Sequence, residues 1–101
     1  MILYGSSLSP FVRKVLACAG EKGIQLDLKP TGDAPGQPGP EFLGASPLRK
    51  MPALVDGDYR LADSSAIIQY LEALHPEPNL IPTEPRARGR TIWLEEYGDT
   101  M

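Results

Sequence analysis

The stretch Arg49-Lys50-Met51-Pro52-Ala53-Leu54 sets a proline between a basic dipeptide and an apolar pair. Pro52 cannot donate a backbone hydrogen bond, so we expect it at the first residue of a strand or in a tight turn. Proline is also the residue at which a cis peptide bond costs least, roughly 0.5–1 kcal/mol relative to trans. A cis bond here would turn the backbone N–H and C=O of Met51 outward, where an extended, peptide-like ligand can pair with them.

Two strands and a helix are predicted downstream of this stretch. Residues 53–55 and 59–61 form the arms of a hairpin around Asp56-Gly57, a favoured pair for a two-residue turn. Asp63-Ser64-Ser65 is a strong N-cap cluster for the helix that follows. His75-Pro76 ends this helix, whose apolar side carries Ile67, Ile68, Tyr70, Leu71 and Leu74 and whose polar face carries Gln69 and Glu72.

A strand–helix–strand unit is predicted upstream. The apolar run 2–4 is typical of a short buried strand, and Ser9-Pro10 has the N-cap serine and first-position proline of a helix start. The helix should end at Gly23 in a left-handed cap, and the alternation over 24–28 predicts a second strand, parallel to the first. The apolar arc of the helix comprises Phe11, Val12, Val15, Leu16, Cys18 and Ala19.

The remaining stretch and the resulting fold follow from this order. Residues 30–40 hold four prolines and three glycines, which indicates a surface loop, and 41–44 is long enough for one helical turn. The order β-α-β, loop, β-β-α predicts an α/β fold of the thioredoxin-like kind. We expect a βαβ-ββα sandwich with a mixed four-stranded sheet and flanking helices.

Composition excludes several function classes. The chain has 101 residues, 42% hydrophobic and 23% charged, with a net charge of −3, which argues against a nucleic-acid partner. No apolar run approaches the roughly 18 residues of a membrane span, so we expect no membrane partner and a cytoplasmic location. Cys18 is the single cysteine, which permits no internal disulfide and no four-thiolate metal site, and no metal is expected.

Three motifs together resemble one protein family. Ser9-Pro10-Phe11, with Arg13, Val15 and Glu21-Lys22-Gly23, looks like the first helix of serine-type glutathione transferases. The run from Ser46 to Leu54 resembles the motif before their third strand, and Asp63-Ser64-Ser65-Ala66-Ile67 resembles their glutathione-contacting helix start. These motifs cover roughly residues 1–80 in the right order and spacing.

The resemblance implies that Ser9 is the catalytic residue. In the family, the matching serine donates a hydrogen bond to the sulfur of glutathione and favours the thiolate, which attacks the electrophile. Ser9-Pro10 could also be only a helix start, since serine before proline caps a helix in any protein. The accompanying motifs favour the catalytic interpretation. Ser6 and Ser7 remain rivals, because some serine-type classes place the working hydroxyl nearer the strand end.

The resemblance also implies the glutathione-binding residues. Met51, with Pro52 behind it, would pair its backbone with the cysteinyl backbone of glutathione. Lys50 would lie near a glutathione carboxylate, although a solvated lysine is an equally good interpretation. Ser64 and the helix N-terminus would hold the γ-glutamyl carboxylate and Asp63 would face the γ-glutamyl ammonium, roles that are compatible with capping. No residue is assigned to the glycyl end.

The function implied by the resemblance is that of a glutathione transferase, with glutathione as co-substrate and an electrophilic small molecule as its partner. Residues 1–80 would be the glutathione-binding domain. Residues 81–101 would be the connector and first helix of an all-helical domain, and the full-length protein would be a homodimer. One alternative is a regulatory or binding module of the same fold without significant catalysis. A thioredoxin-like redox protein is a weaker alternative, because no cysteine lies near Ser9.

Overall fold

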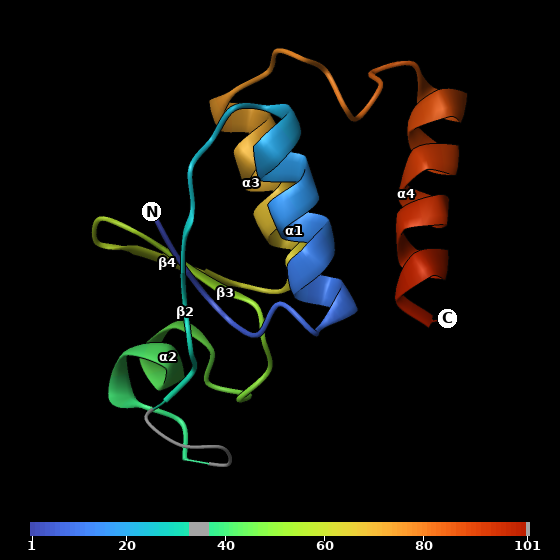
Figure 1. Ribbon diagram of the computed structural model, residues 1–101. Coiled ribbons are helices and arrows are strands. Elements are labelled where there is room, and N and C mark those ends of the chain that lie inside the picture. Colours follow the sequence, from blue (N-terminus) through green and yellow to red (C-terminus); the bar gives the residue numbers. More distant parts are fainter. Residues whose placement is uncertain (33–36, 101) are drawn as a thin grey trace.

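A mixed four-stranded sheet is the centre of the computed structural model, which describes residues 1–32 and 37–100 (Figure 1). The strands are β1 (Ile2–Tyr4), β2 (Asp27–Lys29), β3 (Ala53–Asp56) and β4 (Tyr59–Ala62), in the order β2-β1-β3-β4. β1 pairs in parallel with β2 and antiparallel with β3, which pairs antiparallel with β4. The predicted thioredoxin-like fold class is confirmed.

Helices cover both faces of this sheet. α1 (Pro10–Glu21) and α3 (Ser64–Leu74) lie side by side on one face, and α2 (Pro40–Ala45) packs against β3 and β4 on the other (Figure 1). Because side chains alternate along a strand, Leu3 and Leu54 enter the core beneath α1 and α3, whereas Tyr4 and Ala53 pack with α2. The larger core is completed by Val12, Val15, Ile67 and Leu71, all fully buried.

The helix ends follow the capping residues in the sequence. Ser9 is the N-cap of α1 with Pro10 at its first position, and Gly23 has φ +69°, the left-handed conformation expected after a helix. Asp63 is the N-cap of α3, and its carboxylate Oδ2 accepts a hydrogen bond from Ala66 N at 3.2 Å. The predicted termini of both helices are therefore confirmed.

Two local predictions are wrong. The second strand covers Asp27–Lys29 and not 24–28, because its parallel register is fixed by the three residues of β1, with Ile2 opposite Asp27. The hairpin turn is Gly57-Asp58, since Asp56 pairs with Tyr59 in the ladder and Gly57 takes φ +63°. Residues 33–36 of the predicted 30–40 loop lie outside the described residues.

A buried lysine ties the connector after α3 to the domain. The Lys22 side chain is fully buried, and its Nζ lies 2.9 Å from Glu72 Oε2 and donates to the carbonyl oxygens of His75 (2.6 Å) and Pro78 (2.7 Å). Glu72 in turn accepts from Leu80 N at 3.0 Å. The predicted polar face of α3 is thus not wholly exposed, because Glu72 contacts the buried Lys22 side chain.

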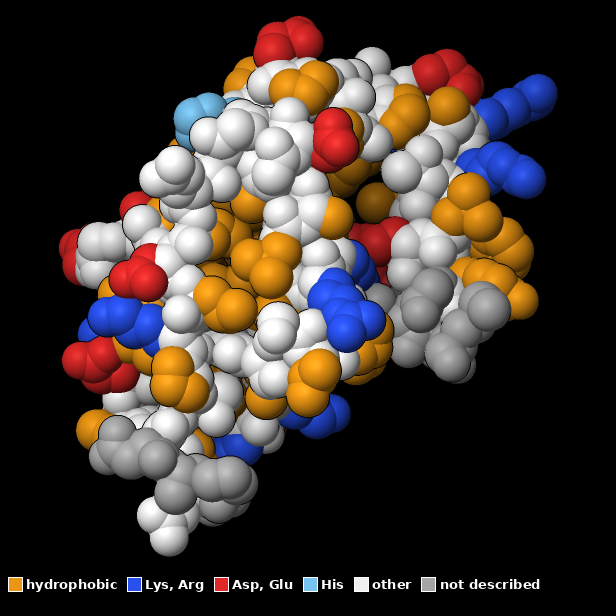
Figure 2. All heavy atoms as spheres, in the orientation of Figure 1, with side chains coloured by type: hydrophobic (Ala, Val, Ile, Leu, Met, Phe, Trp, Pro, Cys, Tyr) orange, Lys and Arg blue, Asp and Glu red, His pale blue; other side chains and the backbone are white. Residues whose placement is uncertain are grey.

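The connector leads to α4 (Pro85–Thr100), which lies beside α1 (Figure 1). Glu95 of α4 lies 3.8 Å from Lys14 Nζ and accepts from the Ser65 hydroxyl at 3.1 Å, so α4 contacts both α1 and the start of α3. Figure 2 shows hydrophobic side chains along the outer side of α4. Trp93 and Leu94 of this helix are about half exposed. Within the described residues, no helix combines the length and apolar character that crossing a bilayer requires.

Candidate functional site

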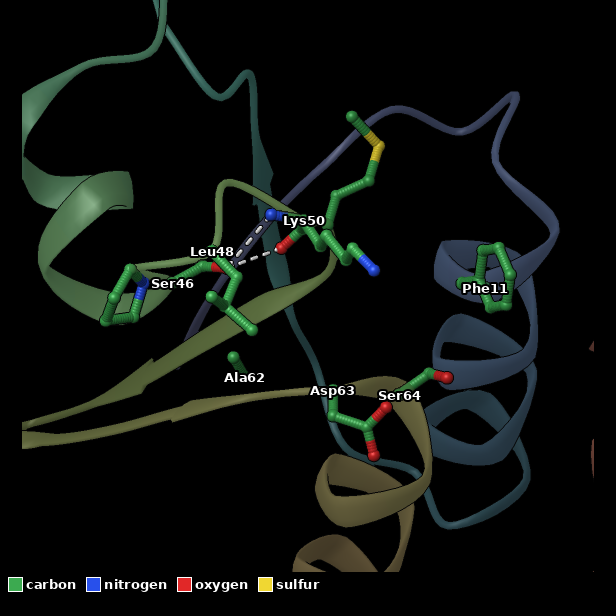
Figure 3. A pocket seen from close by; sticks show the side chains of 9 residues that line it. Phe11, Ser46, Leu48, Lys50, Ala62, Asp63 and Ser64 are labelled. Atoms are coloured by element: carbon green, nitrogen blue, oxygen red, sulfur yellow. Dashed lines mark hydrogen bonds between the residues drawn. The ribbon is translucent and has the colours of Figure 1, made fainter.

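A cavity of about 670 Å³ opens between the N-termini of α1 and α3 and the loop before β3, a size typical of small-molecule sites. Four of the predicted site residues line it: Lys50, Met51, Asp63 and Ser64. Its remaining lining residues are Phe11, Ser46, Pro47, Leu48 and Ala62. In Figure 3, Phe11, Asp63 and Ser64 lie across the cavity from Leu48 and Lys50. The fold therefore brings together residues that are separated by more than fifty positions in the sequence.

Ser46 fixes the loop that carries Lys50 and Met51. Its buried hydroxyl donates to the carbonyl oxygen of Lys50 at 2.7 Å and accepts from the Lys50 amide at 3.1 Å, as the dashed lines in Figure 3 show. Arg49, between the two ends of this closed loop, takes φ 61°, a conformation that non-glycine residues rarely adopt. The backbone is thereby held in one shape immediately before Met51.

Met51 lies just outside the sheet. The ladder begins at Ala53, which pairs with Tyr4 on one side and Ala62 on the other, and Pro52 is fully buried. The Met51–Pro52 peptide bond is cis. Because Met51 precedes the first ladder pair of β3, its backbone groups lie beyond the end of that strand, where an extended ligand would pair with them.

The start of α3 borders the cavity through Ser64. The first amides of a helix have no acceptor within it, and together with the helix dipole they attract negative charge. Ala66 N and Ile67 N are bound by the side chain and the carbonyl oxygen of Asp63. The two amides before them belong to Ser64, which lines the cavity, and to Ser65. Ser64 itself is buried, whereas Asp63 is exposed and has φ 79°. The helix start therefore favours negative charge at this end of the cavity.

The three candidate serines lie in the segment between β1 and α1. Ser9 caps α1, accepting from Val12 N at 3.4 Å, and is not one of the residues that line the cavity. Ser6 accepts from Leu8 N through its hydroxyl at 3.2 Å, and the Ser7 carbonyl oxygen accepts from Arg13 Nε at 2.7 Å. Ser9 is the nearest of the three in sequence to Phe11, which does line the cavity.

Phe11 is a site residue that the sequence placed in the core. Its ring is 37% exposed and forms part of the cavity wall, although it falls on the apolar arc of α1. The arc identifies the apolar side of a helix but does not tell whether core or cavity faces a given turn. Its position two residues after Ser9, in the first turn, is the signal that would have separated it from the buried residues further along α1.

Two acidic side chains of α4 contact Ser65, the residue after Ser64. The Ser65 hydroxyl shares its one proton between Glu96 Oε1, at 2.5 Å, and Glu95 Oε2, at 3.1 Å. Burial raises the pKa of the Glu95 carboxyl, against the opposing effect of Lys14, whereas the bond from Ser65 lowers the pKa of Glu96. Among the described residues, no three His, Cys, Asp or Glu side chains are grouped to hold a metal ion.

The chain is similar in sequence and in structure to proteins of one family. The sequence model of the glutathione S-transferase N-terminal domain matches residues 3–79. Glutathione S-transferase 3 of Zea mays is 36% identical over 96 residues, which cover 92% of this chain and 43% of the relative. The human glutathione transferase theta-2, solved in complex with glutathione, is 35% identical with a TM-score of 0.80, and the match covers 97% of this chain and 42% of that one.

A bacterial maleyl pyruvate isomerase, described as a zeta-class glutathione S-transferase, is 27% identical with a TM-score of 0.77. That match covers 89% of this chain and 43% of the isomerase. The chain thus spans less than half the length of each of these relatives. By the family match over most of its length, the chain belongs to the glutathione S-transferase family and corresponds to its N-terminal domain.

Proposed function

We propose that this chain is the glutathione-binding part of a glutathione transferase that conjugates or reduces electrophilic small molecules. Support comes chiefly from the cavity, where Lys50, Met51, Asp63 and Ser64 converge from two separate segments of the chain. The glutathione found with the related human theta-2 enzyme points to the same ligand.

The tripeptide would lie extended across this cavity. The amides of Ser64 and Ser65 and the Ser64 hydroxyl would bind the γ-glutamyl carboxylate, and the exposed Asp63 carboxylate would face the γ-glutamyl ammonium. The Met51 backbone would pair with the cysteinyl residue as an added strand does, with the buried Pro52 supporting it. Lys50, exposed on the cavity rim, would attract a second glutathione carboxylate.

Ser9 would activate the thiol. A free thiol of pKa about 8.5 is roughly 3% ionised at pH 7, and a hydrogen bond to a charged acceptor is worth about 1.5–3 kcal/mol, or one to two pKa units. The Ser9 oxygen already accepts from Val12 N, so its proton is free to be donated to sulfur. The thiol proton leaves to solvent, and the sulfur electron pair forms the bond to the electrophile, which gives up a leaving group with its electron pair or, in an addition, a π bond.

The domain organisation and the oligomeric state of the full-length protein are proposed from the same family resemblance. Residues 1–80 would form the glutathione domain, and residues 81–101 would begin an all-helical domain that supplies most of the electrophile site. The full-length protein would be a cytoplasmic homodimer. The half-exposed Trp93 and Leu94 on α4 are consistent with further protein packing there.

The thiol pKa in the complex tests the proposal. In the full-length protein, Ser9→Ala should raise the pKa of bound glutathione by one to two units, measured from the ultraviolet absorbance of the thiolate against pH. Ser7→Ala is the matched control and should leave this pKa unchanged, because the bond from Arg13 is made to the Ser7 backbone oxygen, which alanine keeps. Ser6→Ala tests the rival serine. A shift in Ser6→Ala or Ser7→Ala while Ser9→Ala leaves the pKa unchanged would move the role to that serine. Binding with a pKa near 8.5 in every variant and in the parent would favour a binding or regulatory module.

A further inference from the structure

The segment that carries Ser9 is a short turn with little apolar burial. Ser9 N donates to the carbonyl oxygen of Ser6 at 3.0 Å, which closes a β-turn over residues 6–9, here named the 6–9 turn. The Ser6 hydroxyl accepts from Leu8 N within the same turn. Leu8 is 79% exposed, so hydrophobic packing does not anchor the turn to the domain. These internal bonds fix its shape but not its orientation relative to α1.

Arg13 supplies a bond that fixes this orientation. Its side chain reaches back from the first full turn of α1, and its Nε donates to the carbonyl oxygen of Ser7 at 2.7 Å. Its backbone N donates to the carbonyl oxygen of Ser9 at 3.0 Å, but this is the first backbone bond of the helix, which any residue would make. The side-chain bond is therefore the contact that depends on arginine. A charged donor makes a stronger bond than a neutral one, and the planar guanidinium fixes its direction.

The Ser9 side chain depends on this support. Its capping bond to Val12 N is 3.4 Å long, beyond the usual 2.7–3.2 Å range for N–H···O bonds, so the cap alone holds the hydroxyl weakly. A rotation of the 6–9 turn would carry the Ser9 oxygen away from the helix start while leaving the cavity residues of other elements in place. Orientation of the hydroxyl is what a hydrogen bond to a thiolate requires.

We propose that Arg13 is a positioning residue, which acts through the Ser7 carbonyl oxygen to hold the Ser9 hydroxyl toward the glutathione sulfur. This inference rests on the proposed function of Ser9. It predicts that thiol activation and glutathione binding can be changed separately, because the groups proposed to bind the peptide part of glutathione lie on the loop before β3 and on α3. Thiol activation should fall when Arg13 is changed, and binding of the tripeptide backbone should not.

The test uses Arg13→Met in the full-length protein, with Arg90→Met on the exposed side of α4 as the control. We expect the pKa of bound glutathione to rise by about one unit in Arg13→Met, which is about a tenfold loss of thiolate below that pKa. The dissociation constant of S-methylglutathione, which has no thiol, should change less than twofold. The thermal midpoint should match that of Arg90→Met.

Arg13→Lys separates positioning from charge. Lysine keeps the positive charge, but its donor lies one bond, about 1.5 Å, further along the chain than Nε. We expect it to recover less than half of the lost thiol activation. Full recovery by lysine, or an unchanged pKa in Arg13→Met, would overturn the inference while leaving the proposed function intact. Failure of the parent protein to bind glutathione or S-methylglutathione would overturn both.

Discussion

Removal of the buried Lys22 ammonium should destabilise the domain strongly. Lys22→Met keeps the side chain as far as Cε but leaves Glu72 without its cation and the carbonyl groups of His75 and Pro78 without their donor. Breaking a buried ion pair by removing one partner costs roughly 3–5 kcal/mol. Because Glu72 keeps 14% exposure and the bond from Leu80 N, we expect the lower end, about 3 kcal/mol.

Denaturant unfolding and the thermal midpoint measure this cost. At roughly 4–8 °C per kcal/mol for a domain of this size, about 3 kcal/mol lowers the midpoint by about 12–24 °C. Lys29→Met is the matched control, since Lys29 is half exposed and lies 3.9 Å from Asp27, and it should change stability by less than about 0.5 kcal/mol. In Lys22→Met with Glu72→Leu, the uncompensated charge is gone and part of the loss should be recovered.

A small loss of stability in Lys22→Met would refute this reasoning. If Lys22→Met costs less than about 1 kcal/mol, the pair behaves like a surface ion pair, and the connector is not held to α1 and α3 in the way described. Loss of stability equal in the single and double variants would also contradict the reasoning, because it would show that the unpaired Glu72 charge contributes nothing.

Three further predictions concern other parts of the domain. Glu95→Gln should raise the thermal midpoint at neutral pH. The raised pKa of Glu95 means that its protonated form stabilises the fold below the unfolded value near 4.5, and this contribution is lost as pH rises through the folded pKa. A midpoint difference between variant and parent that does not depend on pH would contradict this. Gly5→Ala would bring a Cβ to 2.5 Å from Val12 Cγ2 and should cost about 1–3 kcal/mol, whereas Gly20→Ala, in open space on α1, should be neutral or stabilising in the same unfolding assay. Ser46→Ala should cost about 1–3 kcal/mol and weaken glutathione binding in a calorimetric titration, because it releases the loop before β3; unchanged affinity would show that this loop needs no such support.

The sequence predicted the sheet and the helix ends because their signals are local. Ser9-Pro10, Gly23 and Asp63 act on the backbone within a few residues, so each could be identified without knowledge of the fold. The position of β2 could not be obtained in this way, because its parallel register is set by β1 across the helix between them. Alternation over 24–28 indicates extended chain but not which of its residues pair.

Part of the site could be predicted from motifs in the sequence. Lys50, Met51, Asp63 and Ser64 could be named because they lie in motifs resembling a known family, and they do meet at one cavity. Phe11 was assigned to the core, since helical periodicity does not distinguish a cavity from a packed neighbour.

The Lys22–Glu72 pair was missed altogether. The two residues lie fifty positions apart, and each looks like an ordinary solvated charge on its own helix. Neither the periodicity of α1 nor that of α3 indicates that the ends of both helices enclose a charged contact beneath the connector.

Titration of reduced glutathione into the folded full-length protein tests the central claim most directly. We predict saturable binding with a dissociation constant in the millimolar range or tighter, and a loss of at least tenfold in affinity for Ser64→Ala, because a hydrogen bond to a carboxylate is worth about 1.5–3 kcal/mol. Absence of binding by folded protein, or binding that Ser64→Ala leaves unchanged, would contradict the assignment of this cavity to glutathione.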